Sequence, residues 1–364
     1  MRHRVPGTVI VLVLASVCSS GLAQGGELAK LRWVLGTPVL DPLVAHTSLA
    51  QYHGWFREEG IEVEMTALGG GAKTTALVAA GNAELGFVAA EEGLLNAARG
   101  VDLGVVYIYN QNRAPIFHWA FLPESPVTDL RQLREKRIGV NDLASSSVHY
   151  AKGELRSLGL DPARDVTFVA VGIDQQAYAA LKGGHIDALV GIDTSLARLQ
   201  TAGLSLRVWK DTPYSRDYFS GGLTTRRELL KARRRDLVGF FRGMNKGIVF
   251  ALENPTATVK IHWKMYPESK PKGFAEDVAL RNTLHVLAAR AYKWSREGRR
   301  VPKFGAFAKE EWELIARALG VQDKVDVTKL YTNELIDDAG AFDEAKVRAF
   351  ARAFNFEEYE RTRR

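Results

Sequence analysis

The chain has 364 residues, of which 46% are hydrophobic and 25% are charged, and its formal net charge is +7. This is the composition of a globular protein and excludes a disordered or fibrous chain, and the length favours two lobes, because one core rarely grows beyond about 250–300 residues. The densest basic run, Lys231 to Arg235, lies on a helical pattern, so we expect a solvated helix face there and no binding of nucleic acid.

The first residues have the pattern of an export signal. Basic residues at Met1 to Arg4 precede an apolar run at Val9 to Val17 and a small-residue stretch that ends at Ala23. The apolar run is shorter than the roughly 20 residues that span a bilayer. We therefore expect a cleaved signal peptide over residues 1–23 and a location in the periplasm.

Cysteine use supports the same location. The only cysteine, Cys18, lies within this segment, so a chain cleaved after Ala23 has no disulfide or thiolate metal site. A lipid anchor on Cys18 is the alternative, although Val17 is bulkier than the residue usual before a lipidated cysteine. No H-E-x-x-H or G-x-S-x-G motif occurs. We expect no catalytic residues, no metal and no cofactor.

Apolar runs and helical patterns alternate through the rest of the chain. Strands are predicted at 31–36, 61–68, 84–89 and 103–110, with a helix at 43–60 and another after the glycines at 69–71. A second series has strands at 137–140, 166–171, 186–191 and 204–209, with helical patterns at 145–157, 175–181 and 194–202. Strands separated by helices of this length predict an α/β fold with mostly parallel sheets.

Two aromatic-rich, extended segments join the two series. They are Ile116 to Pro123 and Tyr218 to Thr225, and we interpret them as the connections between the lobes. The remainder is mainly helical. A chain that crosses over and returns makes the first lobe discontinuous, so we assign residues 24–115 and 221–364 to lobe 1 and residues 116–220 to lobe 2.

A helix–turn–strand unit occurs in both series. Gly81 corresponds to Gly184 and Glu84 to Asp187, and each acid opens a short apolar run. Since ligands of open α/β sheets bind beyond the carboxyl ends of the strands, the duplication favours two lobes that present similar edges to one ligand. Chance similarity is the alternative, because helices stopped by glycine are common.

The segment Gly54 to Val88 resembles the pattern G-x-F-x-x-E-G-[LI]-x-V-E … G-G … L-x-x-G-x-x-[DE]-x-G of ABC-transporter substrate-binding proteins. The group binds nitrate, sulfonates, taurine or thiamine-pyrimidine precursors. Leu330 to Phe350 is similar to the closing segment of the group, and the resemblance covers most of Leu31 to Phe356. It implies the type II periplasmic-binding-protein fold, with two hinge crossings and lobes that close on a small-molecule ligand. The implied partner is an ABC permease in the inner membrane, and the implied state is a monomer.

One departure bears on the ligand. Pyrimidine binders of the group carry D-W-x-P-N-x-x-H after the first strand, and of this pattern only Pro38 and His46 remain here. A sulfonate-like or taurine-like anion or zwitterion is therefore the first candidate, and a thiamine-pyrimidine precursor or another heterocycle is the alternative. An enzyme on the same scaffold and a ligand-sensing partner of a membrane receptor are competing functions.

Ligand-contacting residues are expected where strands end and helices begin. Gly70, Gly71 and Ala72 precede a helix, where exposed N–H groups attract anions, although a plain strand–helix turn explains them equally. Further candidates at such positions are Thr37, Pro38, Ala90 and Asn110.

Polar and aromatic candidates complete the set. Ser145, Ser146 and Ser147 open a helix of the second series, where a ligand contact and an N-cap are the two interpretations. Glu91 and Asp193 follow matching strands and are suited to an amine, unless they only favour helix starts. Tyr218 stacks on a ligand or packs at a hinge.

His46 and His53 share a helix face. We interpret them as packed histidines rather than as a metal pair, and His46 is also a candidate ligand contact.

Overall fold

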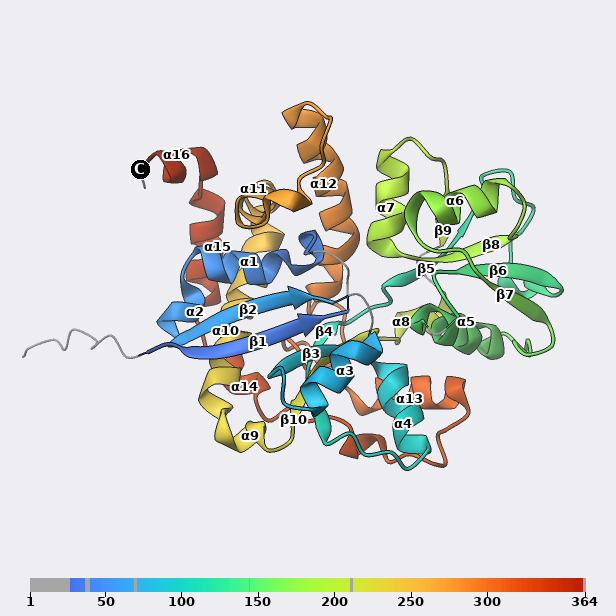
Figure 1. Cartoon of the computed structure of the whole chain (residues 1–364), viewed down its shortest axis with the longest axis horizontal. Coiled ribbons are helices and arrows are strands. Elements are labelled where there is room, and N and C mark those ends of the chain that lie inside the picture. Colours follow the sequence, from blue (N-terminus) through green and yellow to red (C-terminus); the bar gives the residue numbers. More distant parts are fainter. Residues whose placement is uncertain (1–26, 37–39, 69–70, 144, 210–211, 363–364) are drawn as a thin grey trace, which may run out of the picture.

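The structure is a computed structural model, and it describes residues 27–36, 40–68, 71–143, 145–209 and 212–362 (Figure 1). The predicted signal segment and the candidate residues Thr37, Pro38 and Gly70 lie outside these ranges. No helix within the described ranges combines the length and the apolarity that a membrane crossing requires.

Two separate five-stranded sheets organise the chain. The first, in the order β2-β1-β3-β10-β4, contains β1 (Ala29–Leu35), β2 (Ile61–Ala67), β3 (Leu85–Ala89), β4 (Val105–Asn112) and β10 (Gly221–Arg226). The second, in the order β7-β6-β8-β5-β9, contains β5 (Phe117–Phe121), β6 (Lys136–Val140), β7 (Val166–Ala170), β8 (Ala188–Ile192) and β9 (Arg207–Trp209). In each sheet one strand, β10 or β5, runs antiparallel to its neighbours. The predicted fold class, an α/β protein with two lobes and mostly parallel sheets, is confirmed, and we call the parts built around these sheets lobe 1 and lobe 2.

The predicted connecting segments contribute more to the sheets than expected. Most of Ile116 to Pro123 forms β5, and most of Tyr218 to Thr225 belongs to β10. In β5 the aromatic side chains are buried, so the segment is drawn into the core of lobe 2. At the start of β10, a Cβ on Gly221 would lie 2.3 Å from the carbonyl oxygen of Val88. Only glycine lets the returning chain enter the first sheet there.

The helices cover the sheets and fill the C-terminal part. Those before β5 are η1 (Pro42–Val44), α1 (Ala45–Tyr52), α2 (Trp55–Glu58), α3 (Gly71–Ala79) and α4 (Ala90–Ala98). Those between β5 and β10 are η2 (Leu130–Leu133), α5 (Ser146–Ser157), α6 (Asp174–Lys182), α7 (Asp193–Thr201) and α8 (Pro213–Arg216). After β10 come α9 (Leu229–Ala232), α10 (Arg234–Glu253), α11 (Pro255–Met265), η3 (Pro267–Ser269), α12 (Glu276–Ala291), η4 (Tyr292–Trp294), α13 (Lys309–Leu319), η5 (Val327–Lys329), α14 (Ile336–Ala339), α15 (Glu344–Ala353) and α16 (Phe356–Thr362).

The prediction of one continuous helix over residues 43–60 is wrong. The segment forms two helices, α1 and α2, which are separated at Gly54, whose φ is +77°. An α-helix needs negative φ, so a left-handed residue ends one helix and starts another.

The repeated helix–turn–strand unit has a structural explanation. Gly81 and Gly184 have φ of +81° and +67° and end the turns after α3 and α6. Glu84 accepts hydrogen bonds from the backbone N–H of Arg32 (2.8 Å) and from its guanidinium (2.7 Å). Asp187 accepts the equivalent bonds from Arg137 (2.8 and 3.2 Å). Glu84 therefore joins the amino end of β3 to β1, and Asp187 joins the amino end of β8 to β6.

The two lobes touch on two sides of the connections. On one side α13 packs against α4 of lobe 1 and α5 of lobe 2, within an apolar cluster that includes Val88, Val190 and Trp312. On the other side α12, which packs on lobe 1, lies beside α7 of lobe 2 (Figure 1).

Candidate functional site

The carboxyl edge of the first sheet gathers several candidate residues. Gly221 of β10 pairs with Ala89, the last residue of β3, and with Asn112, the last residue of β4. The chain leaving β3 enters α4 at once, so Ala90 and Glu91 follow at this edge. Asn110 lies two residues before the end of β4. The topology thus brings two predicted strand ends together.

Buried polar atoms without a hydrogen-bond partner concentrate at this edge. They are both amide atoms of Asn110, Oε1 of Gln111, Oδ1 of Asn112 and Oε2 of Glu91. These four side chains are at most 5% exposed. A buried polar atom left without a partner costs about 1–3 kcal/mol, so such a concentration is typical of a place that receives a ligand or ordered water.

Glu91 contacts another predicted site residue, Tyr218. The Tyr218 hydroxyl donates a hydrogen bond to Oε1 of Glu91. Burial nevertheless raises the pKa of Glu91 to about 7, because desolvation outweighs this bond. The Tyr218 ring packs on Tyr150 of α5, at 5.0 Å between centroids, and on Tyr214, at 5.5 Å. The Glu91 carboxyl group therefore lies where lobe 1 meets lobe 2.

The three predicted serines lie at the start of α5. The Ser145 hydroxyl caps the helix by accepting from the N–H of Ser147 (3.1 Å), so the N-cap interpretation is correct for this residue. The Ser147 hydroxyl donates to Oδ1 of Asn141 (3.0 Å) and is buried, whereas Ser146 is half-buried on the first turn.

His46 lies next to the carboxyl edge of the first sheet, which we call the polar edge because of its buried polar atoms. Its Nε2 is 3.4 Å from Nε2 of Gln111, and its ring is 4.5 Å from that of Trp294. Burial, assisted by the charge of Arg290, lowers the pKa of His46 to about 3, so the ring stays neutral. Its Nδ1 is a further buried atom without a partner.

His53 packs among aromatic rings, including Trp55 and Phe250, each at 4.9 Å. The described ranges contain no group of three histidine, cysteine or acidic residues placed to hold a metal ion.

Asp193 pairs with cations of the protein itself. Its carboxylate accepts hydrogen bonds from Arg290 (2.5 and 2.8 Å) and Lys293 (2.5 Å). Its Oδ1 also accepts from the N–H of Thr194 (2.7 Å). Burial opposes ionisation, but the two cations outweigh it and hold the pKa of Asp193 below its ordinary value. In this conformation the carboxylate is occupied, and it links α7 of lobe 2 to α12 and η4 of lobe 1.

The remaining candidates are placed by their elements. Gly71 and Ala72 are the first residues of α3, and Ala90 is the fully buried first residue of α4.

Sequence reasoning missed Gln111, Arg290 and Lys293. The polar run "NQNR" at the end of an apolar strand was a usable signal for the first. Arg290 and Lys293 lie in the mainly helical C-terminal part, where the sequence suggested no site residue.

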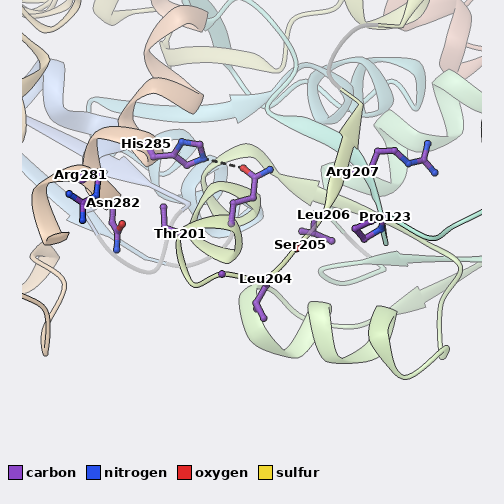
Figure 2. A pocket seen from close by; sticks show the side chains of 11 residues that line it. Pro123, Thr201, Leu204, Ser205, Leu206, Arg207, Arg281, Asn282 and His285 are labelled. Carbon is purple, nitrogen blue, oxygen red and sulfur yellow. Dashed lines mark hydrogen bonds between the residues drawn. The ribbon is translucent and has the colours of Figure 1, made fainter.

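Two cavities lie at the contact of α7 with α12. The larger, about 710 Å³, is an open groove. Figure 2 shows Arg281, Asn282 and His285 on one side of it and Thr201 and Leu204 across from them. The smaller, about 250 Å³, is lined by Asp41, Arg198 and residues of α7 and α12. Neither is lined by a predicted site residue, and the larger is lined mostly by exposed or half-buried side chains. The buried polar edge is therefore the stronger candidate site.

Comparisons with known proteins agree with this architecture. A protein-family model described as "NMT1/THI5 like" matches residues 42–258. No curated protein matches the sequence significantly.

Among solved structures, a protein from Bordetella bronchiseptica RB50 is 23% identical, with a TM-score of 0.63 over 86% of this chain and 97% of that one. The aliphatic sulphonate-binding protein SsuA from Escherichia coli is 16% identical, with a TM-score of 0.61 over 83% and 97%. The alkanesulfonate-binding protein SsuA from Xanthomonas axonopodis pv. citri, solved with bound MOPS, is 18% identical, with a TM-score of 0.57 over 86% and 98%. At these identities the structures establish a shared fold.

Proposed function

The chain belongs to the NMT1/THI5-like family, and from this premise we propose that it is the extracytoplasmic solute-binding component of an ABC importer. It captures a small polar organic molecule between its lobes and delivers it to a permease in the inner membrane. The observation that carries the proposal is the set of buried polar atoms without partners on Glu91, Asn110, Gln111 and Asn112.

The chemistry of this edge favours a ligand with both donor and acceptor groups. The amide of Asn110 offers a donor and an acceptor, while Gln111 and Asn112 each offer an oxygen. Glu91, with a pKa of about 7, offers a further acceptor when ionised and a donor when protonated. A neutral His46 adds a ring nitrogen without adding charge. The ammonium group of a taurine-like zwitterion can donate to these oxygens, and its sulfonate can accept from the Asn110 amide. The fold shared with two sulfonate-binding proteins supports that class.

Binding acts by shifting a population of conformations. A ligand that touches both lobes only when they are closed stabilises the closed state by its extra contacts. Glu91 on lobe 1 and the first turn of α5 on lobe 2 supply those contacts, with Tyr218 between them. Burial of the ligand among preformed polar groups offsets the cost of ordering the lobes.

Native mass spectrometry of freshly purified protein, followed by a thermal-shift panel, tests the proposal. The panel contains taurine, alkanesulfonates, amino acids, aromatic acids and pyrimidines. A binding compound at 100 times its Kd adds about 2.7 kcal/mol of stability. A panel without any binder and a protein that carries no compound would contradict the proposal, as would chemical turnover of the bound compound.

A pair of variants locates the site. Asn110→Ala removes two partnerless atoms at the polar edge, and we expect it to weaken binding about tenfold or more. Asn282→Ala changes the open groove of Figure 2 and serves as the matched control. Loss of binding in Asn282→Ala alone would move the site to the cavities between α7 and α12, both of which Asn282 lines.

A further inference from the structure

The contact between α7 and α12 is built from charges that alternate between the lobes. Three acids and three bases take part, and they are Asp41, Asp174, Asp193, Arg198, Arg290 and Lys293. We call this set the charged seam. Asp41, Arg290 and Lys293 lie on elements packed on lobe 1, and the other three lie on α6 and α7 of lobe 2.

The inner part of the seam is fully buried. The side chains of Asp193, Arg290 and Lys293 are 1%, 5% and 0% exposed. Oxygen–nitrogen distances of 2.5 Å join Asp193 to each base. Removing one partner from such a group leaves a buried charge uncompensated, which costs several kcal/mol. The observed contact between the lobes therefore depends on all three charges together.

The outer part reaches the solvent. Arg198, 39% exposed, bridges Asp41 of lobe 1 (3.2 Å) and Asp174 of lobe 2 (3.1 Å). Nearby, Gln200 of α7 and His285 of α12 lie within hydrogen-bond distance (3.1 Å). The dashed line at His285 in Figure 2 marks this contact. Water can replace these partners as the lobes separate.

The opposite side of the molecule is apolar. There α13 joins α4 and α5, and its Trp312 and Ile315 are fully buried in a cluster shared by both lobes. Pulling this cluster apart exposes apolar surface at about 25 cal/mol per Å², whereas separated ions regain hydration. Separation of the lobes at the seam is therefore less costly than separation beside α13, and we call the α13 side the pivot side.

We propose that the charged seam is a latch that holds the two lobes closed without a ligand and sets the fraction of open molecules. Breaking a seam contact raises the open population, because the open state hydrates a charge that the closed state leaves unpaired. The proposal requires two lobes that move and does not depend on which ligand, if any, the protein binds.

Pulsed electron–electron distance measurements on dialysed protein test the latch. In a Cys18→Ser background, one spin-labelled pair spans the seam at Lys182→Cys and Arg281→Cys, which are exposed positions on α6 and α12. A second pair reports on the pivot side, at Arg164→Cys and at Arg317→Cys on α13. Each pair is measured alone and combined with Asp193→Asn, Arg198→Gln or Asp187→Asn.

For Asp193→Asn we expect the ratio of open to closed molecules to rise about tenfold or more, seen as a longer distance at the seam pair only. Arg198→Gln raises it less, because its ion pairs are solvent-screened. Asp187→Asn removes a carboxylate that pairs with Arg137 inside lobe 2 and leaves both distances unchanged.

Two results would overturn the latch. One is a distance at the seam pair that equals the wild-type distance, both in Arg198→Gln and in every Asp193→Asn sample that circular dichroism shows to be folded. The other is an equal change at the pivot pair, which would place the pivot elsewhere. If Asp193→Asn does not fold, Arg198→Gln alone decides.

Discussion

At the scale of single residues, Glu91 is the most perturbed acid at the polar edge. Its position is fixed because α4 begins directly after β3, which leaves no loop to turn the side chain towards water. One carboxylate oxygen accepts from Tyr218, and the other has no partner among the described residues. The pKa of about 7 follows because the carboxyl group is buried and only one of its oxygens accepts a hydrogen bond.

Because burial raises the pKa of Glu91, we expect the stability of the folded protein to decrease as pH rises. The folded pKa is about 7 and the unfolded value is about 4.3, so the unfolded chain loses its proton first as pH rises. Stability contributed by Glu91 therefore falls between about pH 4.3 and 7 and stays low above it.

We expect the Glu91→Gln variant not to lose this stability as pH rises. At pH 8 it should be more stable than wild type by about 2–3 kcal/mol. Urea denaturation of both proteins at pH 5 and pH 8 measures the difference. Glu62→Gln, on an exposed position of β2, should follow the wild-type curve. A Glu91→Gln protein that loses stability in parallel with wild type would show that Glu91 is ionised in the fold.

At the scale of elements, the first turn of α1 is held close to α10 by one glycine. A Cβ on Gly247 would lie 1.9 Å from the carbonyl oxygen of His46. The backbone cannot yield as a flexible side chain does, so any larger residue must push the two helices apart. This close packing positions His46 beside Gln111.

We expect Gly247→Ala to lower the free energy of unfolding by about 3 kcal/mol, because it overpacks the core against a backbone atom. Gly298→Ala, which meets nothing within 4 Å but has φ of +67°, should cost only about 1 kcal/mol. Denaturant titrations of the two variants rank them. Equal losses would show that α1 and α10 readjust freely.

The repeated acids give a second prediction at this scale. Glu84→Ala should cost about 1–2 kcal/mol, since the carboxylate accepts from both the backbone and the guanidinium of Arg32. Asp187→Ala should cost less, because its side chain is more exposed (29% against 10%) and its contact with the Arg137 guanidinium is longer. The reverse order, measured by urea denaturation, would contradict the equivalence of the two units.

The sequence predicts an element well when residues close together in the chain determine its structure. The strands of both series were found, because short apolar runs bounded by turns report burial directly. The break at Gly54 was missed, because a glycine within a helical pattern is usually tolerated. The role of the repeated acids was also missed. Their partners, Arg32 and Arg137, are about 50 residues away along the chain, and only the strand order brings them close.

At the scale of the whole molecule, the two-lobe architecture was predictable and the seam between the lobes was not. The alternation of strands and helices, with two returning segments, specified two sheets. The candidate site was predictable in part, since Glu91 and Asn110 follow from the rule that ligands bind at carboxyl strand ends. Arg290 of α12 and Lys293 of η4 lie about 100 residues beyond Asp193 in the chain, and no local pattern indicates their pairing.

A crystal structure with the compound that native mass spectrometry identifies tests the central claim most directly. We expect the compound to contact Asn110 and Glu91 of lobe 1 together with the first turn of α5 in lobe 2, enclosed between them. A compound seated in the open groove beside Arg281, or bound to one lobe alone, would contradict the proposed capture between the lobes.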